Sequence, residues 1–269
     1  MILSKPLAFL KKDFLEQSSY KFNFITQFIG IFLSTILFYF VSKLVGTAAS
    51  PYLKPYGGDY FAFVLIGIAF SSYLSVALSS FSTAIQGAQV SGTLEALLVT
   101  QTSIPTIIIS SSLYSFLLTS LRVVLYLLLG AFVFGVNMDA KGIPIAILIL
   151  MLTTIAFSSL GIISASFIMV LKRGDPFMWI FTNASWFLGG VYYPVDVLPS
   201  WLQKLSYFLP ITYALEGMRL ALLKGYSIFQ LKFHILALLL FCIIMLPLSV
   251  TIFIFAVQKT KRDGSLTHY

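Results

Sequence analysis

Few side chains in this sequence could carry out catalytic or metal chemistry. Its 269 residues include nine Asp and Glu, two His and one Cys. An enzyme site inside a membrane needs paired carboxylates, a cluster of His ligands, or a nucleophile beside a base. His234 and His268 are far apart in the sequence, and Cys242 lies inside an apolar run. No catalytic residue and no metal site is therefore predicted, and an intramembrane enzyme remains only as the alternative of another class.

Three charged residues have surroundings that indicate a binding or packing role. Arg122 interrupts an apolar run over residues 104–138, and charges inside a membrane span are costly and often functional. It could bind an anionic headgroup or a glycan phosphate, or it could snorkel or pair within the protein. Glu216 and Arg219 stand about one helical turn apart, so they could form an ion pair.

The composition indicates which kind of fold must position these residues. Hydrophobic residues make up 59% of the chain and charged residues 10%, against roughly 45–50% and about 25% in soluble domains. Mean hydropathy is +0.97. The net charge of +8 is spread over both ends and the gaps between apolar runs, a pattern typical of loops at phospholipid headgroups. Membrane lipids are therefore the expected partner, and nucleic acid is not.

Long stretches without charge predict an all-α polytopic membrane protein. A membrane span takes about 20 apolar residues, and the run over 104–138 contains no polar turn, so it is predicted to form one long helix. We expect a single domain over residues 1–269: an interfacial segment at 1–21, a six-helix bundle over 22–257 and a cytoplasmic tail at 258–269. The six predicted spans cover residues 22–44, 60–84, 104–135, 142–171, 176–192 and 232–257.

The distribution of Lys and Arg predicts the orientation. Six spans place both termini on one side, and the cytoplasmic side of a membrane protein is enriched in these residues. The side with the termini receives nine of them: Lys5, Lys11, Lys12, Lys21, Lys172, Arg173, Lys259, Lys261 and Arg262. The other side receives seven: Lys43, Lys54, Lys141, Lys204, Arg219, Lys224 and Lys232. Both termini are therefore predicted to be cytoplasmic.

Three segments are not simple spans. Residues 1–21 predict an amphipathic helix in the membrane surface, with an apolar stripe of Leu3, Leu7, Leu10 and Phe14 opposite Lys5, Lys12 and Glu16. This helix could be a surface anchor or a docking surface for a cytoplasmic partner. Residues 86–103 predict a short cytoplasmic helix that carries one carboxylate, Glu95, and is too short to fold alone. It could be a plain loop helix or a partner contact.

The third segment, residues 192–219, is rich in aromatic residues and contains Pro194, Pro199 and Pro210. Prolines at this spacing exclude one straight helix. The segment predicts short, broken, re-entrant helices at the outer membrane boundary, where aromatic rings anchor. An ordinary interfacial loop is the alternative.

Two motifs in these segments carry a family resemblance. Gly92-Thr93-Leu94-Glu95 resembles the Gly-Thr-Leu-Glu loop of the ABC-2 type permeases, the membrane subunits of type V ABC exporters. The series Tyr193-Pro194, Leu198-Pro199 and Pro210-x-Thr212-Tyr213-x-x-Glu216-x-x-Arg219 is similar to the region before the final helix of that family. The order of six helices agrees over nearly the whole chain.

The resemblance implies a permease subunit of an ATP-driven exporter in the cytoplasmic membrane of a prokaryote. It implies a homodimer of permeases on two separate ATPase subunits, which bind ATP and Mg²⁺; this chain has no G-x-x-x-x-G-K-[ST] phosphate loop and is expected to bind no cofactor. The substrate would be amphipathic, lipid-linked or a glycan. An ATP-independent secondary transporter or channel is the alternative. Residues implied in ATPase coupling are Gly92, Thr93, Leu94, Glu95, Lys12 and Glu16. Residues implied at the exit are Tyr193, Pro194, Pro199, Pro210, Tyr213, Glu216 and Arg219.

Overall fold

The computed structural model describes residues 7–8, 10–12, 14–15, 21–46, 48–90, 104–171 and 176–262. Within these ranges the chain is helical and contains no strand. Five long helices form the body of the molecule: α2 (Lys21–Val45), α4 (Tyr60–Val90), α6 (Ile104–Leu128), α7 (Ile143–Leu171) and α11 (Lys232–Arg262). The π-helical turn η2 (Leu129–Val133) continues α6.

These five helices are long and apolar enough to cross a membrane, so the prediction of an all-helical polytopic membrane protein is confirmed. The sixth predicted span corresponds to α8 (Pro176–Leu188), which has only 13 residues. A helix of that length covers about 20 Å, less than the hydrocarbon core of about 30 Å. The described residues therefore contain five candidate spans and one shorter helix where six spans were predicted.

The long third helix agrees with the prediction. One continuous helix, α6 followed by η2, runs from residue 104 to residue 133 through Arg122. It stays continuous because the sequence here contains no polar turn and no internal glycine before residue 130, and a continuous helix pairs its interior backbone groups with one another in an apolar environment.

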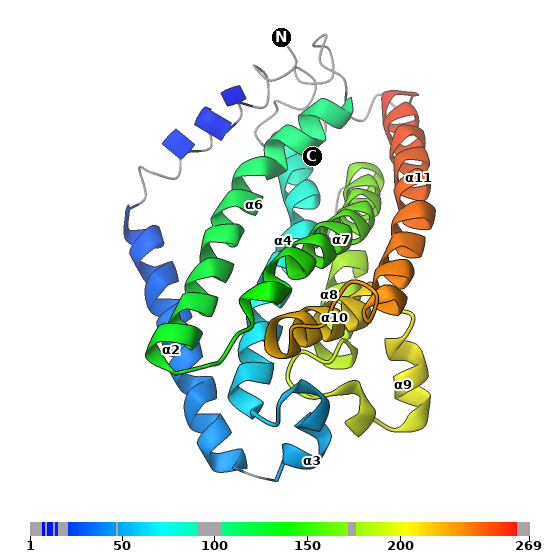
Figure 1. The fold of residues 1–269 in the computed structure, drawn as a ribbon. Coiled ribbons are helices and arrows are strands. Elements are labelled where there is room, and N and C mark those ends of the chain that lie inside the picture. The colour runs from blue at the N-terminus through cyan, green and yellow to red at the C-terminus, as the bar shows by residue number, and fades with distance from the viewer. Residues whose placement is uncertain are drawn as a thin grey trace.

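Helix α4 lies at the centre of the bundle and packs mainly on α7 and α6 (Figure 1). In the apolar 18-residue window of its span 72% of the residues are buried, against 11% in α2 and 17% in α11. Small polar residues bring α4 and α7 together: the hydroxyls of Ser82 and Ser164 lie 2.7 Å apart, and a Cβ on Gly161 would lie 2.6 Å from the carbonyl oxygen of Leu78. Such contacts are typical of close helix packing in membranes.

The short elements gather at one end of the bundle. They are α3 (Ser50–Leu53), η1 (Lys54–Tyr56), η3 (Ala140–Gly142), η4 (Val195–Val197), α9 (Ser200–Ser206) and α10 (Pro210–Lys224). In Figure 1 this is the lower end, whereas α2 begins and α11 ends at the upper end. Helix α10 runs across the bundle rather than along it, and 11 residues of its 15 are buried.

The three prolines of this region each start a helix. Pro194 and Pro199 are the N-caps of η4 and α9, and Pro210 is the first residue of α10. Proline suits these positions because the first N–H groups of a helix have no partner within it and the ring presets φ. The segment predicted to contain short, broken helices thus contains three of them.

Candidate functional site

Residues 189–225, which we call the short-helix module, are attached to the bundle through the buried side chain of Arg219 on α10. Its Nε donates to the carbonyl oxygen of Phe63 on α4 at 3.0 Å. Its Nη1 and Nη2 donate to the carbonyl oxygens of Gly190 and Val191 at 2.8 and 2.9 Å. The guanidinium also lies 3.4 Å from the centre of the Phe63 ring. Arg219 therefore joins α10, α4 and the turn after α8.

Arg219 is only 2% exposed, so its charge depends on these contacts. Burial lowers its pKa to about 9, and the guanidinium stays protonated at pH 7. Burial also raises the pKa of the nearby Tyr56, with a further contribution from the carboxylate of Glu216; this phenol stays neutral. Arg219 is thus the only buried charged side chain in residues 189–225, and backbone carbonyl oxygens solvate its charge.

Two glycines make room for this arrangement. A Cβ on Gly67 of α4 would lie 2.3 Å from the carbonyl oxygen of Val191 and 2.5 Å from Nη2 of Arg219. Gly190 has a φ of +74°, in the left-handed region that favours glycine, and this turns its carbonyl toward the guanidinium. Both positions therefore require a residue without a side chain.

The ion pair predicted between Glu216 and Arg219 is not formed. Glu216 instead lies 3.4 Å from Nε2 of His234 at the start of α11. Arg219 turns away from Glu216 because three buried carbonyl oxygens lie within its reach. A planar guanidinium can donate to all three at once. Glu216 is 40% exposed and keeps contact with water without a guanidinium partner.

Two other residues predicted for the exit region, Tyr193 and Tyr213, join the module to α8 and α11, and Gln203 adds a contact within the module. The hydroxyl of Tyr193 donates to the carbonyl oxygen of Phe187 at 2.5 Å. Tyr213 packs against the rings of Phe233 and Phe241 on α11, with centroid separations of 5.9 and 6.3 Å. The amide of Gln203 donates to the carbonyl oxygen of Leu198 at 2.8 Å. These contacts make the module a packed unit and not a solvated loop.

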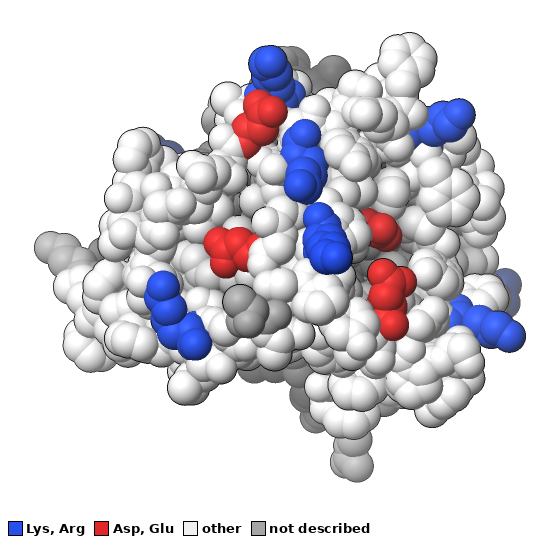
Figure 2. All heavy atoms as spheres, turned by 60° about the horizontal axis from the view of Figure 1, so that its bottom comes forward, with Lys and Arg blue, Asp and Glu red and all other residues white. Residues whose placement is uncertain are grey.

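Charged residues collect at this end of the molecule. All four acidic residues that the structure describes lie in its connecting segments or in α10: Asp59, Asp139, Asp196 and Glu216. Figure 2 shows acidic and basic side chains side by side across this face. A polar hollow of about 30 Å³, lined by Tyr56, Asp196, Glu216 and Arg219 among others, has room for ordered water. This face of the molecule is therefore polar and carries charges of both signs.

The other charge to be placed is Arg122, which lies between α6, α2 and α4 inside the bundle. Its Nη2 donates to Oε1 of Gln27 on α2 at 2.7 Å. Its Nε is buried and has no hydrogen-bond partner. Together with Tyr114, Ser115 and Thr119, these residues line a hollow of about 140 Å³. Arg122 is thus half-satisfied, in a space that could admit another molecule.

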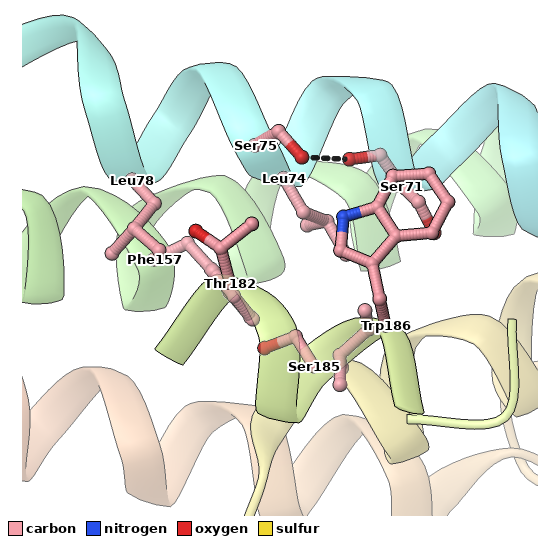
Figure 3. Close-up of a pocket in the computed structure, with 9 residues that line it drawn as sticks. Ser71, Leu74, Ser75, Leu78, Phe157, Thr182, Ser185 and Trp186 are labelled. Atoms are coloured by element: carbon pink, nitrogen blue, oxygen red, sulfur yellow. Dashed lines mark hydrogen bonds between the residues drawn. The ribbon is translucent and has the colours of Figure 1, made fainter. Parts of the chain in front are cut away.

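A third, smaller cavity lies between α4, α7 and α8 (Figure 3). Three buried hydroxyls near it, on Ser71, Thr182 and Ser185, have no hydrogen-bond partner among the described residues. The cavity volume of about 10 Å³ is close to the minimum for one water. Its walls of Leu74, Phe157 and Trp186 leave no space for a larger ligand.

The residues predicted to contact an ATPase are only partly placed. Gly92, Thr93, Leu94, Glu95 and Glu16 lie outside the described residues. Lys12 is exposed on a helical stretch of which residues 7–8, 10–12 and 14–15 are described. Leu7 and Phe14 of the predicted apolar stripe are 59% and 57% exposed. These two residues of the stripe are thus open to a membrane or a partner.

Sequence reasoning missed three contributors. Gln27 carries no charge and resembles any polar residue near a helix start, so nothing marked it as the partner of Arg122. The partners of Arg219 are backbone carbonyls, which no residue type reveals. Gly67 could have been noticed as a small residue in an apolar helix, a type that often marks close approach.

The comparisons with known proteins agree with this architecture. A family model described as ABC-2 type transporter matches residues 7–223. The chain is 25% identical over 185 residues to the inner membrane transport permease YadH of Escherichia coli K12, covering 69% of this chain and 70% of that protein. The protein of the same name from Shigella flexneri gives the same identity and coverage. Because the family model covers most of the sequence, this chain is a membrane protein that belongs to the ABC-2 type transporter family.

Proposed function

We propose that this chain is the permease subunit of an ATP-binding-cassette exporter in the inner membrane of a prokaryote. It moves an amphipathic, lipid-linked or glycan substrate outward, and a separate ATPase subunit supplies the energy. The observation that carries the proposal is the family match over residues 7–223. The name of the relative, an inner membrane transport permease, supports the location.

We further propose six membrane crossings, with α8 as the fifth. Helix α7 ends at the upper end of the bundle in Figure 1, and α11 begins near the lower end, so the chain between them returns across the membrane. Helix α8 has 13 residues and is too short to cross alone. The short-helix module then dips into the outer leaflet as a re-entrant segment and covers the exit of the pathway.

In this proposal both termini lie in the cytoplasm. The described residues at that end carry the basic residues Lys11, Lys12, Lys21, Lys259, Lys261 and Arg262. The described carboxylates are all at the other end. This arrangement agrees with the enrichment of Lys and Arg on the cytoplasmic side of membrane proteins.

The cytoplasmic end couples the permease to its ATPase. We propose that the N-terminal helix, through Lys12 and Glu16, and the loop with Gly92, Thr93, Leu94 and Glu95 receive the ATPase, whose own site binds ATP and Mg²⁺. Glu95 would pair with an Arg or Lys of that subunit. Two copies of the permease form the complex, and the sparsely buried helices α2 and α11 offer apolar faces to lipid and to the second copy.

The test is co-purification of the full-length chain with an ATP-binding-cassette subunit from the same cells, followed by transport in vesicles. Glu95→Ala should weaken this association or uncouple ATP hydrolysis from transport, with the membrane fold intact. Asp196→Ala, which removes an exposed carboxylate at the opposite end, is the matched control. Transport by the isolated chain without ATP would contradict the proposal, and unchanged coupling in Glu95→Ala would remove that residue from it.

A further inference from the structure

Arg122 has more hydrogen-bonding capacity than the protein uses. A guanidinium carries five N–H donors. Among the described residues one acceptor is seen, the amide oxygen of Gln27 at 2.7 Å from Nη2, and Nε is buried without a partner there. Within the part of the chain that the structure describes, no carboxylate is paired with Arg122. The positive charge is therefore not neutralised by any described residue.

An uncompensated charge at this position is unfavourable for the protein alone. Arg122 is near the middle of the candidate span Ser112–Val133, where charges are tolerated when they pair or reach water. An amide oxygen carries only a partial negative charge, so it cannot replace a counter-ion. An anion in the hollow beside Arg122 would supply both the missing acceptor and the missing charge.

Polar residues line much of the hollow. The guanidinium of Arg122, the amide of Gln27 and the polar residues Tyr114, Ser115 and Thr119 all line it. An arginine fork binds phosphate well in a bidentate manner. The further oxygens of a phosphate can accept from the amide of Gln27, which also lines the hollow.

The size of the hollow limits what enters it. Pockets for whole small molecules are about 300–1,000 Å³, whereas this hollow measures about 140 Å³. It has room for a headgroup and not for a complete amphiphile. The remainder of the ligand must lie outside the hollow.

The surroundings of the hollow are suited to acyl chains. Helices α2 and α6 are sparsely covered by the rest of the described chain, with 11% and 22% of the residues buried in the apolar 18-residue window of each. Within two residues in sequence of residues that line the hollow, Ile29 on α2 and the pair Leu117 and Leu121 on α6 are exposed apolar residues. Gln27 is six residues into α2, about 9 Å from its start. Gln27 is also the third residue of the candidate span Ile25–Val45, so the Gln27 side of the hollow is the side nearer the membrane boundary. A headgroup that inserts there would meet the Arg122 side chain while its acyl chains stay in lipid.

We propose that Arg122 and Gln27 form a binding site for the phosphate of an anionic membrane amphiphile, which enters between α2 and α6 from the leaflet at the end where α2 begins. That this amphiphile is the exported cargo rests on the proposed export function. The binding itself does not, and it is measured without the ATPase.

The deciding variant is Gln27→Glu. It places a carboxylate of nearly the same shape against the guanidinium, so it keeps the link between α2 and α6 but neutralises the charge that the ligand needs. The full-length chain is reconstituted in phosphatidylcholine vesicles, and binding of a fluorescent phosphatidylglycerol is measured. The wild type should bind it, and Gln27→Glu and Arg122→Gln should lower the affinity about 10- to 100-fold, the range for hydrogen bonds to a charged group. Lys141→Gln, which removes a positive charge at the opposite end, should leave it unchanged.

Three outcomes would overturn the site. Equal phosphatidylglycerol binding by the wild type and Gln27→Glu would make Arg122 a structural link only. Equal affinity for oleate, an anion without phosphate, would remove the preference for phosphate. Inorganic phosphate that binds as tightly as phosphatidylglycerol would exclude a membrane amphiphile as the source of the group.

The same variants separate this site from the export function. If Gln27→Glu loses lipid binding and still co-purifies with an ATPase subunit, both proposals hold. If lipid binding depends on Arg122 but no ATPase subunit associates with the wild type, the exporter proposal fails and the site stands. If the ATPase associates and lipid binding ignores Arg122, the site fails alone.

Discussion

Two arginines of this chain lie in apolar surroundings and have different kinds of partners. Arg219 donates to three backbone carbonyl oxygens and lies against the Phe63 ring. Arg122 donates to one side-chain amide and keeps a buried Nε without a partner beside a hollow. Both arginines lie on helices, but only in Arg219 does each of the three guanidinium nitrogens donate to an acceptor among the described residues.

The difference separates an architectural residue from a candidate binding residue. Each nitrogen of the Arg219 guanidinium already donates to a buried carbonyl oxygen, and loss of the side chain leaves those carbonyls without this donor in an apolar interior. A guanidinium with spare donors and adjacent space costs the fold little when it is lost, because it stabilises little. Substitution of Arg219 should therefore lower the stability of the protein, whereas substitution of Arg122 should lower the affinity for a ligand and leave stability almost unchanged.

The largest effect on stability is expected for Arg219→Leu. This change removes the donor to the carbonyls of Gly190 and Val191 and the link to α4, so we expect a loss of more than about 3 kcal/mol or failure to accumulate in the membrane. Thermal unfolding in detergent micelles measures it. Lys224→Leu, at an exposed position on the same helix, is the control. Equal melting of both variants would show that Arg219 does not anchor the module.

Gly67→Ala should have an intermediate effect. The added methyl group would lie 2.3 Å from the carbonyl oxygen of Val191, so the turn after α8 must move away from α4. Overpacking of this kind costs about 1–3 kcal/mol. The same melting experiment detects it, with Gly87→Ala on α4 as the control, because a Cβ at that position meets nothing within 4 Å. A variant as stable as the control would mean that the close approach is not maintained.

The smallest change in stability is expected for Arg122→Gln. The substitution removes one hydrogen bond to Gln27 but also removes a charge that no described residue neutralises. The free energy of unfolding, measured by the same melting experiment, should therefore change by no more than about 1 kcal/mol. A loss as large as that of Arg219→Leu would make Arg122 a second structural anchor and would end the contrast between the two residues.

The sequence was sufficient for the long helices and insufficient for the partners. Charge-free runs predict the spans because an apolar interior requires every backbone group to be paired within a helix. Proline positions predict the breaks in the short-helix module, and each proline indeed begins one of its helices. Charge-free runs and proline positions are local properties of the chain, so the amino-acid sequence alone reveals them.

The partners of the charged residues depend on distant contacts. The spacing of Glu216 and Arg219 suggested an ion pair. In the structure Glu216 lies beside His234, and Arg219 donates to three backbone carbonyl oxygens. Residue spacing within a helix reports which side chains are neighbours, not which buried acceptors compete for them. The length of α8 was overestimated for a related reason: the apolar run continues to residue 192, whereas the helix ends at Leu188 before the turn at Gly190.

The bond from Arg219 to Phe63 spans 156 residues of sequence, which has a consequence for how the protein is made. Synthesis proceeds from the N-terminus, so α4 enters the membrane long before α10 exists. During that interval the site on α4 that receives Arg219 is unfilled, as are the carbonyls of Gly190 and Val191 once they emerge. The central helix therefore reaches its final environment only after α10, which lies in the last third of the chain, has been translated, and shortened chains that end before α10 should be targets for membrane quality control.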